Sequence, residues 1–104
     1  MALVHLSDSG FAAFIEKGIA VVDFWAGWCG PCRMFGPIFE AESKRHDTVR
    51  FGKYEITDTN RNMAGKFDVR SIPSILAFKD GAVLDTKIGL MNEAELADWI
   101  KGLS

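Results

Sequence analysis

The chain has 104 residues, of which 48% are hydrophobic and 25% are charged, and its formal net charge is −2 at pH 7. This length suits one compact domain over residues 1–104 with a single core, and the composition excludes an intrinsically disordered protein. The near balance of charge gives no electrostatic reason to bind nucleic acid, so we expect partners to be recognised by shape and chemistry.

The N-terminal segment predicts a short strand followed by a helix. The strand is expected over residues 3–5. In the helix, Phe11, Phe14 and Ile15 recur at helical spacing. Ser7 or Asp8 can cap its beginning, and Gly18 offers an end.

The middle of the chain continues the alternation of strands and helices. The apolar run at 19–25 predicts a buried strand, and a helix follows over about 31–45 that contains a proline, Pro37. Residues 49–56 resemble another strand. The polar segment 58–60 supplies capping chemistry for a short third helix that ends near Phe67.

The last third of the chain predicts a hairpin and a final helix. Strand-like segments at 74–78 and 83–88 flank the turn signal at 79–82. Asn92 and Glu95 match a capping box at the start of the last helix, whose apolar stripe contains four residues: Leu96, Trp99, Ile100 and Leu103. The element order β-α-β-α-β-α-β-β-α predicts an α/β fold with one mixed sheet and helices on both faces.

The two cysteines, Cys29 and Cys32, are three residues apart and directly follow the predicted strand at 19–25. Residues i and i+3 share one face of a helix, so small adjustments at a helix start permit a disulfide between them. Unpaired N–H groups and the helix dipole favour a thiolate at the first cysteine. We therefore expect Cys29 to attack a partner's disulfide and Cys32 to resolve the mixed disulfide.

The expected location is the cytoplasm. The N-terminal segment lacks a basic leader followed by a sustained apolar stretch, and no apolar run is long enough for a membrane helix. A cysteine pair in a reducing cytosol is more often catalytic, redox-sensing or metal-binding than structural.

Asp23 interrupts the apolar run that precedes the cysteines. Burial of its carboxyl group would raise its pKa and would make it a candidate proton acceptor for Cys32. The alternative is a carboxylate at the end of a strand that is exposed to water or caps a loop. The residues alone leave both interpretations open.

The segment from Trp25 to Cys32, Asp23 before it, and the Ile72-Pro73-Ser74 sequence downstream resemble the thioredoxin family, and the similarity extends over essentially the whole chain. The resemblance implies five strands in a central mixed sheet flanked by four helices. It also implies that Asp23 takes the proton of Cys32 through water. Lys53 matches a family lysine near this carboxylate; the alternative is a solvated strand lysine.

The resemblance further implies how targets bind. In the family, the proline that matches Pro73 is cis, which frees the backbone of Ile72 to pair with an extended substrate; on residues alone, a trans turn proline is the ordinary expectation. The expected docking surface around Cys29 comprises Trp28, Gly30, Pro31, Ile72, Pro73 and Gly89. Gly89 could instead simply end a strand, and Trp25 is expected to pack in the core.

The implied activity is that of a general protein disulfide reductase that donates electrons to target enzymes. Thioredoxin reductase is the implied electron donor, and the substrates are diverse proteins that contain disulfides. The Cys29–Cys32 pair is the redox centre, with no cofactor and no metal. We expect a monomer that binds neither nucleic acid nor membranes.

The sequence leaves three alternatives open. A zinc site would need His5 and His46 in addition to the cysteines, at a spacing unlike that of compact zinc modules. The domain could act as a docking or regulatory subunit without turnover. It could also act as an oxidant or isomerase, although Gly-Pro between the cysteines resembles the reductant branch of the family.

The sequence departs from the family pattern at three positions. Ser74 replaces a more usual threonine, and Tyr54 and Glu55 stand where smaller residues are favoured. None of them is part of the sulfur chemistry. Partner preference and reduction potential depend on small shifts in thiolate stabilisation, which residue identity does not fix.

Overall fold

The alternation of strands and helices in the first half of the chain brings three strands side by side in one direction, because a helical crossover returns the chain to the same end of the sheet. The computed structural model describes residues 3–103. Its five strands lie in the order β1 (Val4–Leu6), β3 (Val49–Glu55), β2 (Ile19–Trp25), β4 (Ser74–Lys79) and β5 (Ala82–Ile88). The first three are parallel, and β4 and β5 add the predicted antiparallel hairpin.

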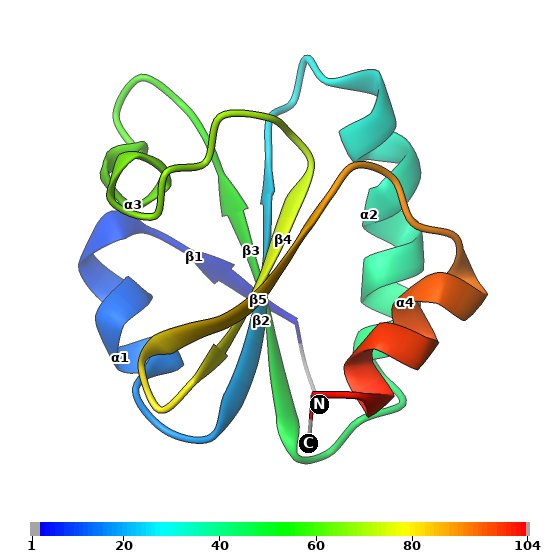
Figure 1. Cartoon of the computed structure of the whole chain (residues 1–104). Coiled ribbons are helices and arrows are strands. Elements are labelled where there is room, and N and C mark those ends of the chain that lie inside the picture. Colours follow the sequence, from blue (N-terminus) through cyan, green and yellow to red (C-terminus); the bar gives the residue numbers. More distant parts are fainter. Residues whose placement is uncertain (1–2, 104) are drawn as a thin grey trace.

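Helices cover both faces of this sheet. They are the 3₁₀ turn η1 (Asp8–Gly10), α1 (Phe11–Ile15), α2 (Gly30–Ser43), α3 (Asn62–Lys66) and α4 (Glu93–Lys101). Figure 1 shows α1 and α3 on one side of the strands and α2 and α4 on the other. The predicted fold, a mixed sheet of five strands with four α-helices, is confirmed. Among residues 3–103, no helix has the length and apolar composition to cross a bilayer.

Strand β2 divides the interior into two cores, because successive side chains point to opposite faces of a sheet. Val21 packs in the core under α2 and α4, whereas Val22 and Phe24 pack in the core under α1 and α3. Asp23 is two residues from Val21 and therefore faces the layer of α2. The strand pattern thus directs this carboxyl group toward the helix that carries the cysteines.

The helix ends show where local sequence signals decide the structure. Asn92 accepts a hydrogen bond from the N–H of Glu95, and the Glu95 side chain accepts one from the N–H of Asn92, which confirms the predicted capping box. Helix α2 extends from Gly30 to Ser43 through Pro37, close to the predicted bounds. Gly18 has a φ of +67° but lies two residues beyond Glu16, the C-cap of α1, and its N–H donates to the Asp80 carboxylate, so it turns the chain into β2 and does not itself cap the helix.

The predicted capping of the first and third helices is wrong. Ser7 makes no side-chain capping bond, and the expected first helix is only η1 and the five residues of α1. The Asp8 carboxylate instead accepts hydrogen bonds from the N–H groups of Asn62 and Met63 at the start of α3. The polar segment 58–60 does not cap α3, because Asn60 bonds to the backbone of Asp8 and Glu55.

Tyr54 explains why Asp8 is drawn away from its own helix. Its ring is fully buried, and its hydroxyl group donates a hydrogen bond of 2.5 Å to the Asp8 carboxylate and accepts one from the N–H of Met63. The hydrogen bond from Tyr54 is the main reason that the pKa of Asp8 is lowered. Burial and the Asp8 carboxylate raise the pKa of Tyr54 to about 12. One hydroxyl group therefore ties η1, β3 and α3 together.

We expect Tyr54→Phe to lower the free energy of unfolding by about 1 kcal/mol at pH 7, the usual net value of a lost hydrogen bond. The pKa of Asp8 should rise in the same variant, because the donor that holds it down is gone. Urea denaturation and NMR titration of the Asp8 carboxyl group measure the two effects. Unchanged values of both would contradict this account of the network.

Candidate active site

The cysteine pair lies where β2 leads into α2. Cys29 is the N-cap residue of α2, with extended backbone angles, and Pro31 occupies the first turn, where helical N–H groups lack partners. The two cysteines form a disulfide with their Cα atoms 5.2 Å apart. The N–H of Cys32 points at the Cys29 sulfur, with 3.3 Å between nitrogen and sulfur. The helix start therefore presents a donor and its positive dipole end to this sulfur.

The two sulfurs differ in their surroundings. Cys29 is 6% exposed and Cys32 is 1% exposed, so Cys29 is the outer one. Its Sγ lies 3.9 Å from the carbonyl oxygen of Ile72. Both cysteines pack with Ala26, and the side chain of Ile72 covers the same cluster. A target sulfur can approach Cys29 more readily than Cys32.

The loop before β4 completes the surroundings of Cys29. The Ile72–Pro73 peptide bond is cis, and the carbonyl of Pro73 accepts a hydrogen bond from the N–H of Gly89 at 2.8 Å. Gly89 has a φ of +97°, a conformation that favours glycine and explains this residue at the end of β5. The contact joins the Pro73 loop to the end of the hairpin beside the cysteine pair.

The expected docking residues differ in exposure. Trp28 is the most open of them, at 80%, and Gly30 and Pro31 are also exposed. Ile72 is half-buried and Pro73 is buried. The surface around Cys29 is therefore made chiefly by the motif itself, with the Ile72 backbone at its border.

Asp23 is fully buried, and neither of its carboxyl oxygens has a hydrogen-bond partner among the described residues. Burial raises the pKa of Asp23 to about 7, and the positive charge of Lys53 opposes this rise. The alternative of an exposed or loop-capping carboxylate is therefore wrong. A carboxyl group of this kind can take up or release a proton near neutral pH.

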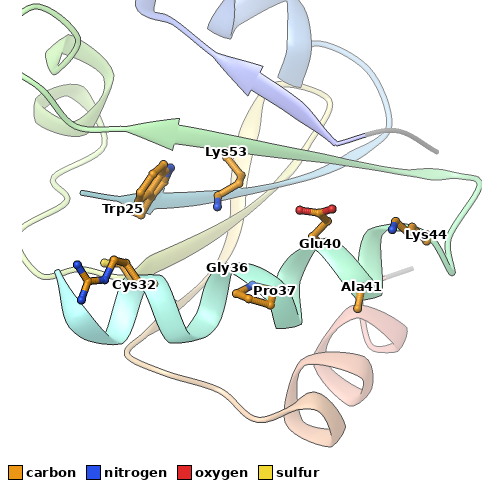
Figure 2. Close-up of a pocket in the computed structure, with 9 residues that line it drawn as sticks. Trp25, Cys32, Gly36, Pro37, Glu40, Ala41, Lys44 and Lys53 are labelled. Carbon is orange, nitrogen blue, oxygen red and sulfur yellow. The ribbon is translucent and has the colours of Figure 1, made fainter. Parts of the chain in front are cut away.

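Lys53 is the register partner of Asp23 on the neighbouring strand β3. Its side chain is half-buried, and its ammonium nitrogen lies 4.5 Å from the centre of the Trp25 ring. Trp25 is not simply a core residue, because it also lines a pocket. This pocket of about 430 Å³ adjoins Cys32 and contains Lys53 in its wall. Figure 2 shows the Lys53 amine reaching from β3 toward α2 in this pocket.

The pocket also contains residues that the sequence analysis did not select. Gly36 and Glu40 line it on α2. The signal that could have found them is their spacing, because Cys32, Gly36 and Glu40 follow one another at intervals of four residues and share a helix face. That face lies opposite β3 and Lys53 (Figure 2).

The alternative of a zinc site is not supported. Within residues 3–103, no group of three or more metal-ligating side chains comes together. His46 lies 2.6 Å from the carboxylate of Glu42 and stacks on Phe51, and His5 lies on β1. Neither histidine serves the cysteine pair.

A disulfide at a helix N-terminus, directly after a strand that carries a buried carboxyl group, is typical of a thiol–disulfide oxidoreductase whose redox centre is the cysteine pair itself. The thioredoxin family model matches residues 2–102. The chain belongs to the thioredoxin family, whose members work through such a pair without a cofactor.

Bacterial thioredoxins are similar to this chain over nearly their whole length. The thioredoxin of Staphylococcus epidermidis is 41% identical over 102 residues, which is 94% of each chain. That of Staphylococcus saprophyticus is 41% identical over 105 residues, or 97% of each chain. The Bacillus subtilis thioredoxin is 38% identical over 101 residues, or 96% of each chain.

The raised pKa of Asp23 predicts a pH-dependent cost to folding. The folded protein holds this proton up to about pH 7, whereas the unfolded chain releases it near pH 3.8, the ordinary pKa of an aspartate side chain. The free energy of unfolding therefore falls as the pH rises between these values. Asp23→Asn removes the cost, so its stabilisation over the natural protein should grow from near zero at pH 4 to about 4 kcal/mol at pH 8.

Urea denaturation of the oxidised protein at both pH values measures this difference. Asp58→Asn is the control, because Asp58 is exposed and its replacement should change little at either pH. Equal stabilisation by Asp23→Asn at pH 4 and pH 8 would contradict the assigned burial cost.

Proposed function

We propose that this protein is a general protein disulfide reductase in which Cys29 attacks the target disulfide and Cys32 resolves the mixed disulfide. The observation that carries the proposal is the asymmetry of the pair at the start of α2. Cys29 is the outer sulfur and receives the N–H of Cys32, and Cys32 lies one turn inward. Both features stabilise a thiolate at the position that a target disulfide can reach.

The reaction consists of two exchanges at sulfur. The Cys29 thiolate attacks one sulfur of the target disulfide, and the second target sulfur leaves as a thiolate. Cys32, once deprotonated, attacks Cys29 and displaces the first target sulfur, also as a thiolate. The target gains two electrons and is released as a dithiol, while the Cys29–Cys32 disulfide forms. The second attack is fast because Cys32 is held on the same helix turn.

Asp23 is the proposed proton acceptor for Cys32, with water as the carrier. Its buried carboxyl group and a pKa of about 7 support this role, because a base works best when its pKa is near the working pH. Lys53, the register partner of Asp23, is proposed to tune that carboxyl group through its charge. The pocket lined by Cys32 and Lys53 is the proposed position of that water.

Target binding is proposed to combine a surface and a backbone contact. Trp28, Gly30 and Pro31 provide the exposed surface, and Pro73 and Gly89 hold the loop that carries Ile72. The Ile72 backbone would pair with an extended target segment next to its disulfide. Such pairing uses backbone groups and depends little on the side chains of the target, so it suits many partner sequences.

Family membership supports the remaining elements of the proposal. Thioredoxin reductase would recharge the oxidised pair, and the reduced protein would donate electrons to disulfide-containing enzymes. We also propose that the chain acts as one monomeric domain in the cytoplasm, without binding nucleic acid.

The test is to trap targets on a variant that cannot resolve the mixed disulfide. Cys32→Ser should accumulate mixed disulfides on Cys29 when mixed with an oxidised substrate protein, as seen by non-reducing electrophoresis and mass spectrometry. Its turnover with reductase should fall by about 100-fold or more, because the tethered thiol is lost.

Cys29→Ser is the matched control and should trap nothing. If Cys29→Ser reduced the substrate as fast as the natural protein, a docking or regulatory role would be favoured. A Cys32→Ser variant that formed no adduct with any oxidised substrate would contradict a general reductase.

A further inference from the structure

Gly36 is an unexpected residue in the interior of α2, because glycine destabilises a helix relative to alanine. A Cβ atom built on Gly36 would meet one neighbouring atom within 4 Å, the ammonium nitrogen of Lys53, at 3.2 Å. Gly36 is itself buried. A side chain at position 36 would therefore contact the amine of Lys53 more tightly than is usual for a Cβ atom, and the amine would have to shift slightly.

The ammonium group of Lys53 is confined on two sides. The ring of Trp25 lies 4.5 Å from it, and the backbone of α2 at Gly36 lies opposite. Figure 2 shows the amine pointing at this stretch of the helix. The pocket that Lys53 lines continues along α2 past Pro37 and Glu40. A displaced amine has room on that side.

Several charged or titratable groups surround the region. Arg33, Glu40 and Lys44 line the pocket from α2, together with Cys32. His5 on β1 is the register neighbour of Lys53, and Ile75, the β4 neighbour of Asp23, carries no charge. Of the charged groups, Lys53 acts on the ionisation of Asp23 by its charge and favours the carboxylate. The position of this amine therefore affects the ionisation of the Asp23 carboxyl group.

We propose that Gly36 is a positioning residue: its missing side chain lets the Lys53 ammonium lie against α2 near Asp23, and so tunes the pH at which Asp23 accepts a proton. The functional consequence, a shift in the pH range of Cys32 deprotonation, rests on the proposed role of Asp23. The positioning itself does not depend on that role.

A second explanation for Gly36 must be separated from this one. The residue before a proline is crowded in the helical conformation because its Cβ meets the proline ring, and Pro37 follows Gly36. That crowding would lower stability in any variant with a Cβ at position 36. It would not move the titration of Asp23 through Lys53.

The experiment is a double-mutant cycle of Gly36→Ala with Lys53→Met, read by NMR titration of the Asp23 carboxyl carbon in the oxidised protein. With Lys53 present, Gly36→Ala should raise the titration midpoint of Asp23 by about 0.3 pH unit, because the amine retreats toward Glu40 and attracts the carboxylate less. In the Lys53→Met background, Gly36→Ala should leave the midpoint unchanged. Gly36→Ser carries the same Cβ and should shift it in the same direction.

Gly65→Ala is the matched control. Gly65 is also helical, a Cβ there would meet nothing within 4 Å, and it is remote from the pocket residues. It should change neither the Asp23 midpoint nor the reductase activity.

Two results would overturn the proposal. The first is that Gly36→Ala does not shift the Asp23 midpoint when Lys53 is present. The second is that Gly36→Ala shifts the midpoint equally in the Lys53→Met background, which would indicate that the added Cβ acts by excluding water. The titration needs no turnover, so this result stands apart from the proposed reaction. If the Asp23 midpoint moves as expected but Asp23→Asn leaves the reductase activity unchanged, the proton-acceptor role is wrong and the positioning by Gly36 remains.

Discussion

Burial of the Asp23 carboxyl group under α2 is the constraint on which the rest of the active site depends. An ionised carboxylate in an apolar layer is costly, and the free energy for burying it comes from the packed cores on both faces of the sheet. The structure compensates only in part, through the charge of Lys53. The site therefore keeps a group that exchanges protons near neutral pH, at the expense of stability.

The fold was predictable because its signals are local and periodic. The apolar run of β2, the turn of the hairpin and the capping box at Asn92 each determine an element without reference to distant parts of the chain. The cysteine pair was predictable for the same reason, since its spacing and the preceding strand specify a helix start. The residues alone left the burial of Asp23 open, because an acidic residue in an apolar run can be buried or can lie exposed at the strand end, and only the packing of α2 on β2 decides.

Interactions between distant segments could not be predicted from local patterns, apart from the approach of Lys53 to Asp23 and of Ile72 to Cys29 that the family resemblance implied. Asp8 looks like a cap for its own helix, yet the hydroxyl group of Tyr54, 46 positions later, draws it to α3. The environment of Lys53 depends likewise on Gly36, which approaches it only when α2 packs on β3. Helical spacing from Cys32 places Gly36 on the correct helix face. The contact with the Lys53 amine cannot be inferred from that spacing, because it forms only in the tertiary structure.

Strand order has a consequence for the nascent chain. The redox motif and Asp23 precede residue 33, whereas β4, the strand that pairs with β2 on its second side, begins at Ser74. Until β4 is synthesised and docks, one edge of β2 lacks its backbone partners, and the Ile72 carbonyl is not yet beside Cys29. The cysteine pair thus emerges from the ribosome well before the Ile72 loop and β4 that flank it in the folded protein. A fragment that ends before β4 would combine reactive sulfurs at the start of α2 with an unpaired, aggregation-prone edge of β2.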